Sequence, residues 1–391
     1  MPSVPSRQNK VLIFFSDIAW EGQRQRPQHL ASRFAKSTRV LWVQPMMLHR
    51  AGYQRLTRVA QGIDAVSVPA FPYNARSSLI RVATRIISAI PSFRHLLLRQ
   101  QRRILCSALK QMNLQGEDTI IFLENSQFIE LALSISKDTI VFDYIDNLFG
   151  FTEFPQYARK LWEKTVHASH IITATSGTLV RQAQSVGALN VCIVSNGVET
   201  DRFRNVGYVS RYDDLPQDSN PILGYVGSLY DWFDFKLIER LSASLPNAHI
   251  VLIGERHPRV HQALSRLRRC PNVHVLGFKP YEKIPQYVSC FAVGLIPFLR
   301  NELTAAVNPV KLYEYAAAGI PTVATNFSPD LNEFHQYILI ALSEEDFIRK
   351  VEHALRGESI PRKEVLQQWG AQNDWDMKSH TIENLIRQHL S

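Results

Sequence analysis

The sequence has few cysteines and no long apolar run. Its 391 residues include only four cysteines, which are too far apart for a zinc site or a disulfide framework. No apolar run reaches the roughly 18 residues that predict a membrane-spanning helix. The polar N-terminal residues lead directly into a predicted strand at 11–15, unlike a secretory signal peptide. We therefore expect a cytoplasmic protein with no metal and no cofactor.

Acidic residues are scarce in the first third of the chain. Residues 1–116 contain 18 lysines and arginines against three acids, and residues 65–115 contain no acid at all. The net charge is +9, so the remainder of the chain is acidic overall. This asymmetry predicts an anionic partner for the first third. Because no helix-turn-helix or aromatic-rich RNA motif accompanies the charge, we expect an anionic membrane surface and no nucleic acid.

Short apolar runs alternate with helical stretches along most of the chain. Continuous apolar runs flanked by helices are typical of parallel strands buried on both faces. Two successive sets of them predict two Rossmann-like, doubly wound α/β domains facing a cleft, with ligands at the carboxyl ends of the strands. The runs are 11–15, 39–43, 64–68, 119–123, 139–145, 170–175 and 190–195, then 221–227, 249–254, 272–277, 291–297, 320–325 and 337–342.

The two sets of runs are separated by a polar stretch with two prolines, residues 208–221, which is typical of a linker between domains. We therefore expect an N-terminal Rossmann-like domain at 1–207 and a C-terminal Rossmann-like domain at 222–373. Residues 374–391 are expected to form a C-terminal helix that packs back on the N-terminal domain.

The stretch "NPVKLYEYAAAGIPTVAT" (308–325) predicts a helix followed by a buried strand. Asn308 is a suitable cap, Pro309 a suitable first residue, and Gly319 a suitable end. Lys311 and Glu314, three residues apart, share one helix face near an N-terminus that attracts anions. A diphosphate at this helix start, around Asn308, Pro309 and Val310, would use Lys311, and ribose hydroxyls would suit Glu314. The alternative is a solvated pair on a surface helix.

The same stretch resembles the sugar-nucleotide motif of two-domain GT-B glycosyltransferases of family 4, or group 1. "VSNGVETDRF" (194–203) and "NVHVLGFKPYEKIPQYVSCFAVGLIPF" (272–298) are also similar to regions of these enzymes. "QRPQHLASRFAK" (25–36) is similar to the opening of a subset that builds bacterial surface polysaccharides. The resemblance covers most of residues 10–330, and it implies a metal-independent enzyme that uses a nucleoside-diphosphate sugar and no cofactor. It also implies that residues 1–207 form the acceptor-side domain and residues 222–373 the nucleotide-sugar domain.

The resemblance also implies roles for particular residues. It makes Glu314 the carboxylate that binds ribose, and it places the donor base against Gly277, Phe278 and Lys279. Two positions depart from the family pattern. Ala306 stands where the family usually has a glutamate, and the stretch after Gly227, "GSLYDWFDFK", has no cation before Lys236.

The glycine turn that opens the second domain is a candidate phosphate site. Gly227 and Ser228 follow a predicted strand, and a glycine there lets backbone N–H groups approach a phosphate. An ordinary strand-end turn fits the same residues equally well.

The first domain offers candidates for the acceptor side. Asp143 and Asp146 follow a predicted strand, and Asp146 lies further into the loop, where it could act as a base or merely cap the next helix. Arg24 and Arg26 precede a predicted helix start at Pro27, where they would meet phosphate or an anionic acceptor, or simply remain solvated.

Residues 77–110 predict a basic amphipathic helix. Leu79, Ala83 and Ile86 fall on one side with further apolar residues, and Arg81 and Arg85 fall opposite. Such a helix is typical of a membrane-surface binder, and the alternative is a helix packed on the first sheet. The predicted membrane contacts are Arg81, Arg85, Arg99, Arg102 and Arg103.

These observations predict a glycosyltransferase at the cytoplasmic face of the membrane. It would move a sugar from a nucleoside-diphosphate donor to a saccharide or lipid-linked acceptor in cell-surface polysaccharide synthesis, with retention of anomeric configuration. Lys311 and Asp146 are its predicted catalytic residues. The alternatives are a nucleotide-sugar epimerase on the same fold, or a non-catalytic scaffold that binds membranes or anions.

Overall fold

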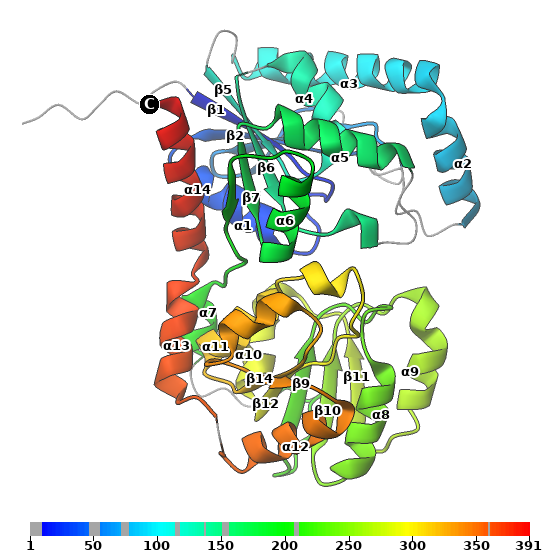
Figure 1. The fold of residues 1–391 in the computed structure, drawn as a ribbon, viewed down its shortest axis with the longest axis vertical. Coiled ribbons are helices and arrows are strands. Elements are labelled where there is room, and N and C mark those ends of the chain that lie inside the picture. Colours follow the sequence, from blue (N-terminus) through cyan, green and yellow to red (C-terminus); the bar gives the residue numbers. More distant parts are fainter. Residues whose placement is uncertain are drawn as a thin grey trace, which may run out of the picture. The chain divides into compact units, whose positions relative to one another are not determined.

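The computed structural model describes residues 10–46, 55–71, 78–113, 118–136, 138–150, 156–206, 211–358 and 360–391. They form two compact units, each with its own sheet (Figure 1). The first unit extends to residue 194, apart from residues 176–178, and includes residues 379–391. The second comprises residues 176–178 and 195–378.

The first unit contains an eight-stranded sheet in the order β3-β4-β2-β1-β5-β6-β7-β8. All its pairings are parallel except β3–β4. The sequence missed β3 because "TRVA" is a short, partly exposed edge strand with no continuous apolar run. The strands are β1 (Lys10–Phe15), β2 (Arg39–Pro45), β3 (Thr57–Ala60), β4 (Ile63–Val68), β5 (Asp118–Leu123), β6 (Thr139–Tyr144), β7 (Ile171–Ala174) and β8 (Val191–Ile193).

The helical stretch predicted at 77–110 consists of two helices, α2 and α3, which meet at Ile90. The break has a local cause, because Pro91 begins α3 and its ring nitrogen cannot donate a helical hydrogen bond. The helices of this unit are α1 (Arg26–Phe34), α2 (Ser78–Ala89), α3 (Pro91–Gln111), α4 (Ile129–Ile135), α5 (Gln156–Ala168), α6 (Gly177–Ser185) and the later part of α14 (Trp375–Leu390).

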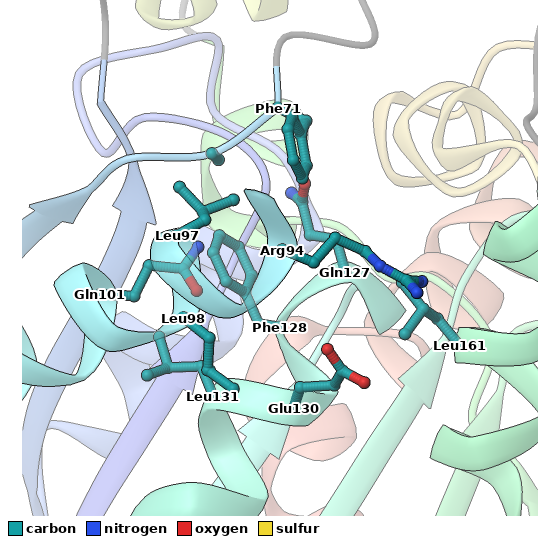
Figure 2. A pocket seen from close by; sticks show the side chains of 11 residues that line it. Phe71, Arg94, Leu97, Leu98, Gln101, Gln127, Phe128, Glu130, Leu131 and Leu161 are labelled. Atoms are coloured by element: carbon teal, nitrogen blue, oxygen red, sulfur yellow. The ribbon is translucent and has the colours of Figure 1, made fainter. Parts of the chain in front are cut away.

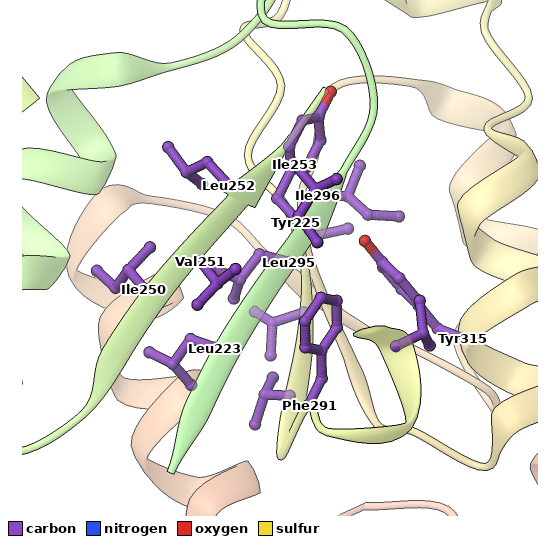
Figure 3. Close-up of a cluster of buried hydrophobic side chains, with 14 of the residues drawn as sticks. Leu223, Tyr225, Ile250, Val251, Leu252, Ile253, Phe291, Leu295, Ile296 and Tyr315 are labelled. Atoms are coloured by element: carbon purple, nitrogen blue, oxygen red, sulfur yellow. The ribbon is translucent and has the colours of Figure 1, made fainter. Parts of the chain in front are cut away.

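The second unit contains an entirely parallel six-stranded sheet in the order β11-β10-β9-β12-β13-β14. The strand order reverses between β9 and β12, which is the place where doubly wound sheets bind ligands. Figure 3 shows the apolar side chains of β9, β10 and β12 packed with Phe291 and Tyr315. The strands are β9 (Ile222–Val226), β10 (His249–Ile253), β11 (Val273–Gly277), β12 (Val293–Ile296), β13 (Thr322–Thr325) and β14 (Leu339–Ala341).

The helices of the second unit follow its strands in the alternating pattern of a doubly wound domain. They are α7 (Thr200–Arg204), α8 (Phe235–Ser244), α9 (His261–Leu267), α10 (Ile284–Ser289), α11 (Val310–Ala318), α12 (Glu344–Leu355) and α13 (Lys363–Gln372). The predicted pair of doubly wound α/β domains is thereby confirmed, because every predicted strand has its counterpart. Among the described residues, no helix combines the length and the apolar character that crossing a bilayer requires.

The division between the units differs from the predicted one at residue 207. Residues 195–206 lie in the second unit, because the backbone N–H of Val198 donates to Asn373 O and the Asn196 side chain donates to Asn308 O. The described part of the predicted linker, 211–221, packs on the second unit through buried Leu215. Residues 208–210 lie outside the described ranges. From Ser379 onward, α14 belongs to the first unit, where Ser37 Oγ donates to Glu383 Oε1 over 3.1 Å.

Candidate active site

Helix α11 begins beside the reversal of strand order in the second sheet, directly after the loop that leaves β12. It spans Val310–Ala318 and ends at Gly319, as the sequence predicts. The predicted cap is wrong, because Pro309 occupies the N-cap and no side chain caps the helix. Asn308 instead accepts from Asn196 N over 2.8 Å and donates from Nδ2 to the Tyr313 hydroxyl over 3.0 Å. Asn308 therefore fastens the loop before α11.

On α11, Glu314 is buried and Lys311 is half-buried. Within the described part of the chain, neither side chain makes a hydrogen bond or an ion pair. The Lys311 ammonium lies 5.3 Å from the ring centre of Tyr225 and 5.0 Å from that of Phe298. Burial lowers the pKa of Lys311 to about 8, and the Glu314 carboxylate opposes that shift. Burial also raises the pKa of Glu314 to about 7, while Lys311 lowers it and Glu199 adds to the rise.

The turn after β9 lies against Lys311. A Cβ atom placed on Gly227 would lie 3.2 Å from Lys311 Nζ, so the absence of a side chain there brings the backbone up to the ammonium group. Ser228 follows in the same turn, and its carbonyl oxygen accepts from the Tyr225 hydroxyl over 3.1 Å. The structure therefore brings the predicted glycine turn and the predicted lysine together, although they are more than 80 residues apart in the sequence.

The residues predicted to hold the base follow β11. Phe278 is exposed, with an aromatic face available for stacking. The Lys279 ammonium is held by Asp214 over 2.5 Å and lies over the Tyr287 ring, and the hydrogen bond to Asp214 raises the pKa of Lys279. Because its charge is already neutralised, Lys279 can contribute to a base site mainly through its backbone.

Arg256 is a cation at this edge of the sheet that the sequence analysis did not identify. It follows β10, and its Nη2 atom lies 2.9 Å from the position that a Cβ atom on Gly277 would occupy. Its side chain is exposed, and within the described ranges no side-chain hydrogen bond or ion pair engages it. The available signal was the pattern "IVLIGER", an arginine two residues after a glycine at a strand end. Arg256 supplies a cation near the site, where the sequence has none between Gly227 and Lys236.

In the first unit, Arg26 does not stand exposed before α1 as predicted. It is buried and forms a bidentate ion pair with Asp143, with Nε 2.7 Å from Oδ2 and Nη2 2.8 Å from Oδ1. Thr173 Oγ1 also donates to Asp143 Oδ1 over 2.6 Å. The pair joins the start of α1 to β6. Removing one partner of such a pair would leave a buried charge without a counter-charge. Arg26 and Asp143 therefore hold α1 against β6, and a contact of either residue with a ligand stays a prediction.

Arg24 is half-buried beside α1. Its Nε donates to His29 Nδ1 over 3.4 Å, and its Nη2 lies 3.5 Å from Ser32 Oγ. These long contacts tie it loosely to the helix, so its predicted contact with phosphate or acceptor stays a prediction.

Asp146 lies beyond the end of β6 and makes no side-chain hydrogen bond to any described residue. Burial, reinforced by the charge of Asp17, raises the pKa of Asp146 to about 7. No described helix start is capped by its side chain, which leaves the predicted role as a base open. A carboxyl group with this pKa can accept a proton near neutrality.

Two further acids, Asp17 and Glu124, end the neighbouring strands β1 and β5. Asn125 Nδ2 donates to Asp17 Oδ2 over 3.0 Å, and Ser16 Oγ donates to Glu124 Oε2 over 2.6 Å. Burial raises the pKa of both carboxyl groups, and the neighbouring charge of Asp17 adds to the rise at Glu124, whose pKa lies well above its usual range. The sequence analysis missed this pair, although Glu124 directly follows one apolar run and Asp17 stands two residues after another, and a parallel sheet brings the ends of both runs to one edge.

The predicted membrane residues lie on α2 and α3. Arg99, Arg102 and Arg103 are exposed on α3. The side chains of Arg81 and Arg85 lie outside the described part of the structure.

A pocket in the first unit, between α3, α4 and α5, is too small for a nucleotide sugar. Figure 2 shows Arg94 and Glu130 among its lining residues, with leucines and Phe128 around them. Its enclosed volume of about 40 Å³ admits a few water molecules at most. The donor candidates of the second unit are therefore the better site.

Comparison with known proteins bears on the family and the fold of the chain. Residues 220–357 match the family model described as "Glycosyl transferases group 1". A relative from Bacillus subtilis (strain 168), "Putative teichuronic acid biosynthesis glycosyltransferase TuaH", is 26% identical over 236 residues, which are 57% of this chain and 59% of the relative. The chain thus spans less than two thirds of that relative.

Two solved structures resemble nearly the whole chain. Sucrose-phosphate synthase from Thermosynechococcus elongatus is 13% identical with a TM-score of 0.71, covering 97% of this chain and 98% of that one. The E. coli structure described as "Trehalose-6-phosphate from E. coli bound with UDP-2-fluoro glucose" is 12% identical with a TM-score of 0.70, covering 97% and 99%. The fold is therefore that of GT-B enzymes. The family match identifies a group 1 glycosyltransferase domain in residues 220–357, which contain the motif at 308–325, and the resemblance in sequence is confirmed.

Proposed function

We propose that this glycosyltransferase moves a sugar from a nucleoside-diphosphate donor to a saccharide or lipid-linked acceptor during the synthesis of a cell-surface polysaccharide. The donor class is supported by the family match and by the UDP-sugar bound in the trehalose-phosphate structure. The pathway class is supported by the name of the Bacillus relative. We propose further that the reaction needs no metal and retains anomeric configuration.

One observation carries the proposal. Glu314 is buried and Lys311 is half-buried, neither has a hydrogen-bond partner among the described residues, and both lie where the strand order reverses. Leaving charged groups buried and unpaired costs free energy, so such a pair marks a place where a ligand supplies the missing partners. The oxygens of a diphosphate would accept hydrogen bonds from the Lys311 ammonium, and ribose hydroxyls would donate hydrogen bonds to the Glu314 carboxylate.

The chemistry follows from the charges at this site. Transfer breaks the bond between the anomeric carbon and the diphosphate oxygen, and the electron pair leaves with the diphosphate. The Lys311 ammonium, the positive end of α11 and the Arg256 guanidinium stabilise that developing charge. The acceptor hydroxyl forms the new bond to the anomeric carbon and gives up its proton. Asp146 is the proposed acceptor of that proton, because its pKa of about 7 suits proton transfer near neutrality.

The proposed location is the cytoplasmic face of an anionic membrane, where a lipid-linked acceptor would be found. Residues 65–115 contain no acid, and Arg99, Arg102 and Arg103 are exposed there. Each such cation contributes about 1 kcal/mol of binding near an anionic surface at low salt.

The test is incubation with UDP-, GDP- and dTDP-sugars and a soluble saccharide acceptor. We expect one donor to yield free nucleoside diphosphate together with a glycosylated acceptor. An isomerised donor without diphosphate release would identify an epimerase, and binding without any reaction would indicate a scaffold. The Lys311→Met variant should fail to transfer, while Lys236→Met, which alters a lysine on α8, should retain transfer.

A further inference from the structure

Helix α2 carries apolar side chains outward and polar side chains inward. Leu79 is 81% exposed and Ile86 is 62% exposed. On the other side of the helix, Thr84 is only 5% exposed and Ser88 is fully buried. A helix that packs on a protein core has the reverse arrangement. The sequence alternative, in which the apolar side of this helix packs on the first sheet, is therefore wrong.

Exposed apolar side chains follow one another along α2 and the beginning of α3. On α2 they recur at the three- and four-residue spacing that places side chains on one helix face, and the stripe continues through Ile90 into the first turns of α3. Figure 1 shows α2 at the margin of the first unit, joined to the start of α3. We call this stripe the apolar face. Its residues are Leu79, Val82, Ile86, Ile87, Ile90, Phe93 and Leu96.

The charges around the apolar face narrow the choice of partner. The sequence from 65 to 115, which contains both helices, has no acidic residue. Further along α3, Arg99, Arg102 and Arg103 are exposed. Isolated exposed apolar residues are ordinary on a protein surface, but a contiguous group marks a binding surface. Apolar side chains on a segment whose only charged residues are cations match a bilayer with anionic headgroups, which offers acyl chains and phosphates at adjacent depths.

We propose that the apolar face inserts into the boundary between headgroups and acyl chains of an anionic bilayer, while the α3 arginines bind lipid phosphates. This inference rests on the membrane partner proposed above and adds the element that enters the lipid. It divides membrane binding into two contributions. The contribution of the arginines is screened by salt, whereas apolar burial persists when salt is raised.

Vesicle sedimentation of the full chain separates these contributions. The wild type should bind phosphatidylglycerol vesicles and bind phosphatidylcholine vesicles poorly. The double variant Leu79→Ser/Ile86→Ser should lose about tenfold in affinity at both low and high salt, because two large apolar side chains no longer insert. The triple variant Arg99→Gln/Arg102→Gln/Arg103→Gln should lose affinity chiefly at low salt. Leu189→Ser, which alters an apolar residue 91% exposed elsewhere in the first unit, should bind like the wild type.

Insertion itself is measured by a tryptophan at the apolar face. Fluorescence of Ile86→Trp should be quenched by brominated phosphatidylglycerol beyond the quenching of the wild type, and Leu189→Trp should show no such increase. Vesicle binding without additional quenching at Ile86→Trp would overturn insertion. A dimer in solution that Leu79→Ser/Ile86→Ser abolishes would also overturn it, by assigning the face to a second copy of the chain.

The same variants distinguish this inference from the proposed function. Transfer to a soluble acceptor should be unchanged in Leu79→Ser/Ile86→Ser, because neither residue belongs to the donor site. If the protein transfers sugar but binds no vesicle, the insertion proposal fails and the transferase stands. If it inserts but transfers from no donor, the enzymatic proposal fails and insertion stands.

Discussion

At the scale of single residues, two ionisable side chains of the second unit lie in an energetically unfavourable environment on α11. Glu314 is buried and Lys311 is half-buried, and neither side chain makes a hydrogen bond to a described residue. Their pKa values have moved toward each other, to about 8 and about 7. Burial therefore brings the pKa of both groups close to neutral pH, where a bound ligand can change their protonation.

These two pKa values predict that nucleotide affinity peaks between about pH 7 and pH 8. Below the peak Glu314 is protonated and becomes a weaker acceptor, and above it Lys311 loses the charge that attracts the diphosphate. Calorimetric titration with UDP, GDP and dTDP across this range measures the profile. Glu314→Gln should remove the acid limb and Lys311→Met the alkaline limb, each with a loss of about ten- to a hundredfold in affinity at the peak. Identical profiles in both variants would refute the donor site.

A second residue-scale prediction concerns Asp146. Its pKa is raised to about 7, so the carboxylate that accepts a proton is present only above that pH, and turnover should rise as the pH passes through this value. Asp146→Asn should lower turnover by about 10² to 10⁴ with little change in donor affinity. Asp138→Asn, which alters an exposed aspartate before β6, is the matched control. If Asp146→Asn kept wild-type turnover, the aspartate would not be the base.

At the scale of elements, the turns after β9 and β10 fit against each other. Gly254 has φ +154°, and a Cβ atom there would lie 1.9 Å from the carbonyl oxygen of Gly227. An alanine could fit only if the Gly227 turn moved, and that turn lies against Lys311. The contact between the two turns therefore sets the position of the phosphate candidate.

Gly254→Ala should accordingly reduce both stability and donor affinity. We expect a loss of about 1–3 kcal/mol in the free energy of unfolding, in the range of local backbone strain, together with weaker nucleotide binding. Denaturant unfolding and calorimetry measure the two effects. Gly357→Ala is the control, because Gly357 also has positive φ, at +73°, but has no neighbouring atom within 4 Å. Equal donor affinity in the two variants would show that the Gly227 turn does not hold the nucleotide.

At the scale of the whole molecule, the chain has two compact units with separate cores. Each can respond separately to a ligand or a substitution. Proteins with several domains commonly depart from a single two-state transition, so the site of a stabilising effect can be located by the transition that it moves.

A bound nucleoside diphosphate should therefore stabilise chiefly the unit that contains Lys311. At a hundred times the dissociation constant, the gain is about 2.7 kcal/mol. In calorimetric scans, addition of the nucleotide should raise the melting temperature of one transition. The Lys311→Met substitution should abolish that rise. Tryptophan fluorescence of a variant that retains only Trp369, a residue of the second unit, assigns the transition. A rise confined to the other unit would contradict the proposed donor site.

The acid pair at the ends of β1 and β5 predicts a pH effect on the first unit. The folded pKa of Glu124 is raised by burial and by Asp17, so folding favours its protonated form. Its favourable contribution is present below the unfolded pKa and is lost as the pH rises through the folded value. Glu124→Gln, a neutral substitute, should therefore stabilise the first unit at pH 8 by about 1–3 kcal/mol. The difference from the wild type should vanish near pH 4, and urea unfolding at both pH values decides it.

The sequence by itself determined the alternation of elements and part of the donor site. Each apolar run became a strand because burial on both faces of a parallel sheet requires continuous apolar side chains, and that requirement is local. The end of α11 at Gly319 and the shared face of Lys311 and Glu314 are local as well. The motif at 308–325 also carried the family resemblance, because its residues lie together in the chain.

Only the tertiary structure decided which charged groups meet. Arg26 pairs with Asp143 and Ser16 with Glu124 across more than 100 positions of sequence, so no local pattern could show that Arg26 is buried or that the pKa of Glu124 is raised. Asn308 looked like a cap until its partners, Asn196 and Tyr313, were placed around it. The outward direction of the apolar side of α2 depends likewise on packing. The sequence pattern shows that the helix has an apolar side and a polar side, and the rest of the fold decides which of them is buried.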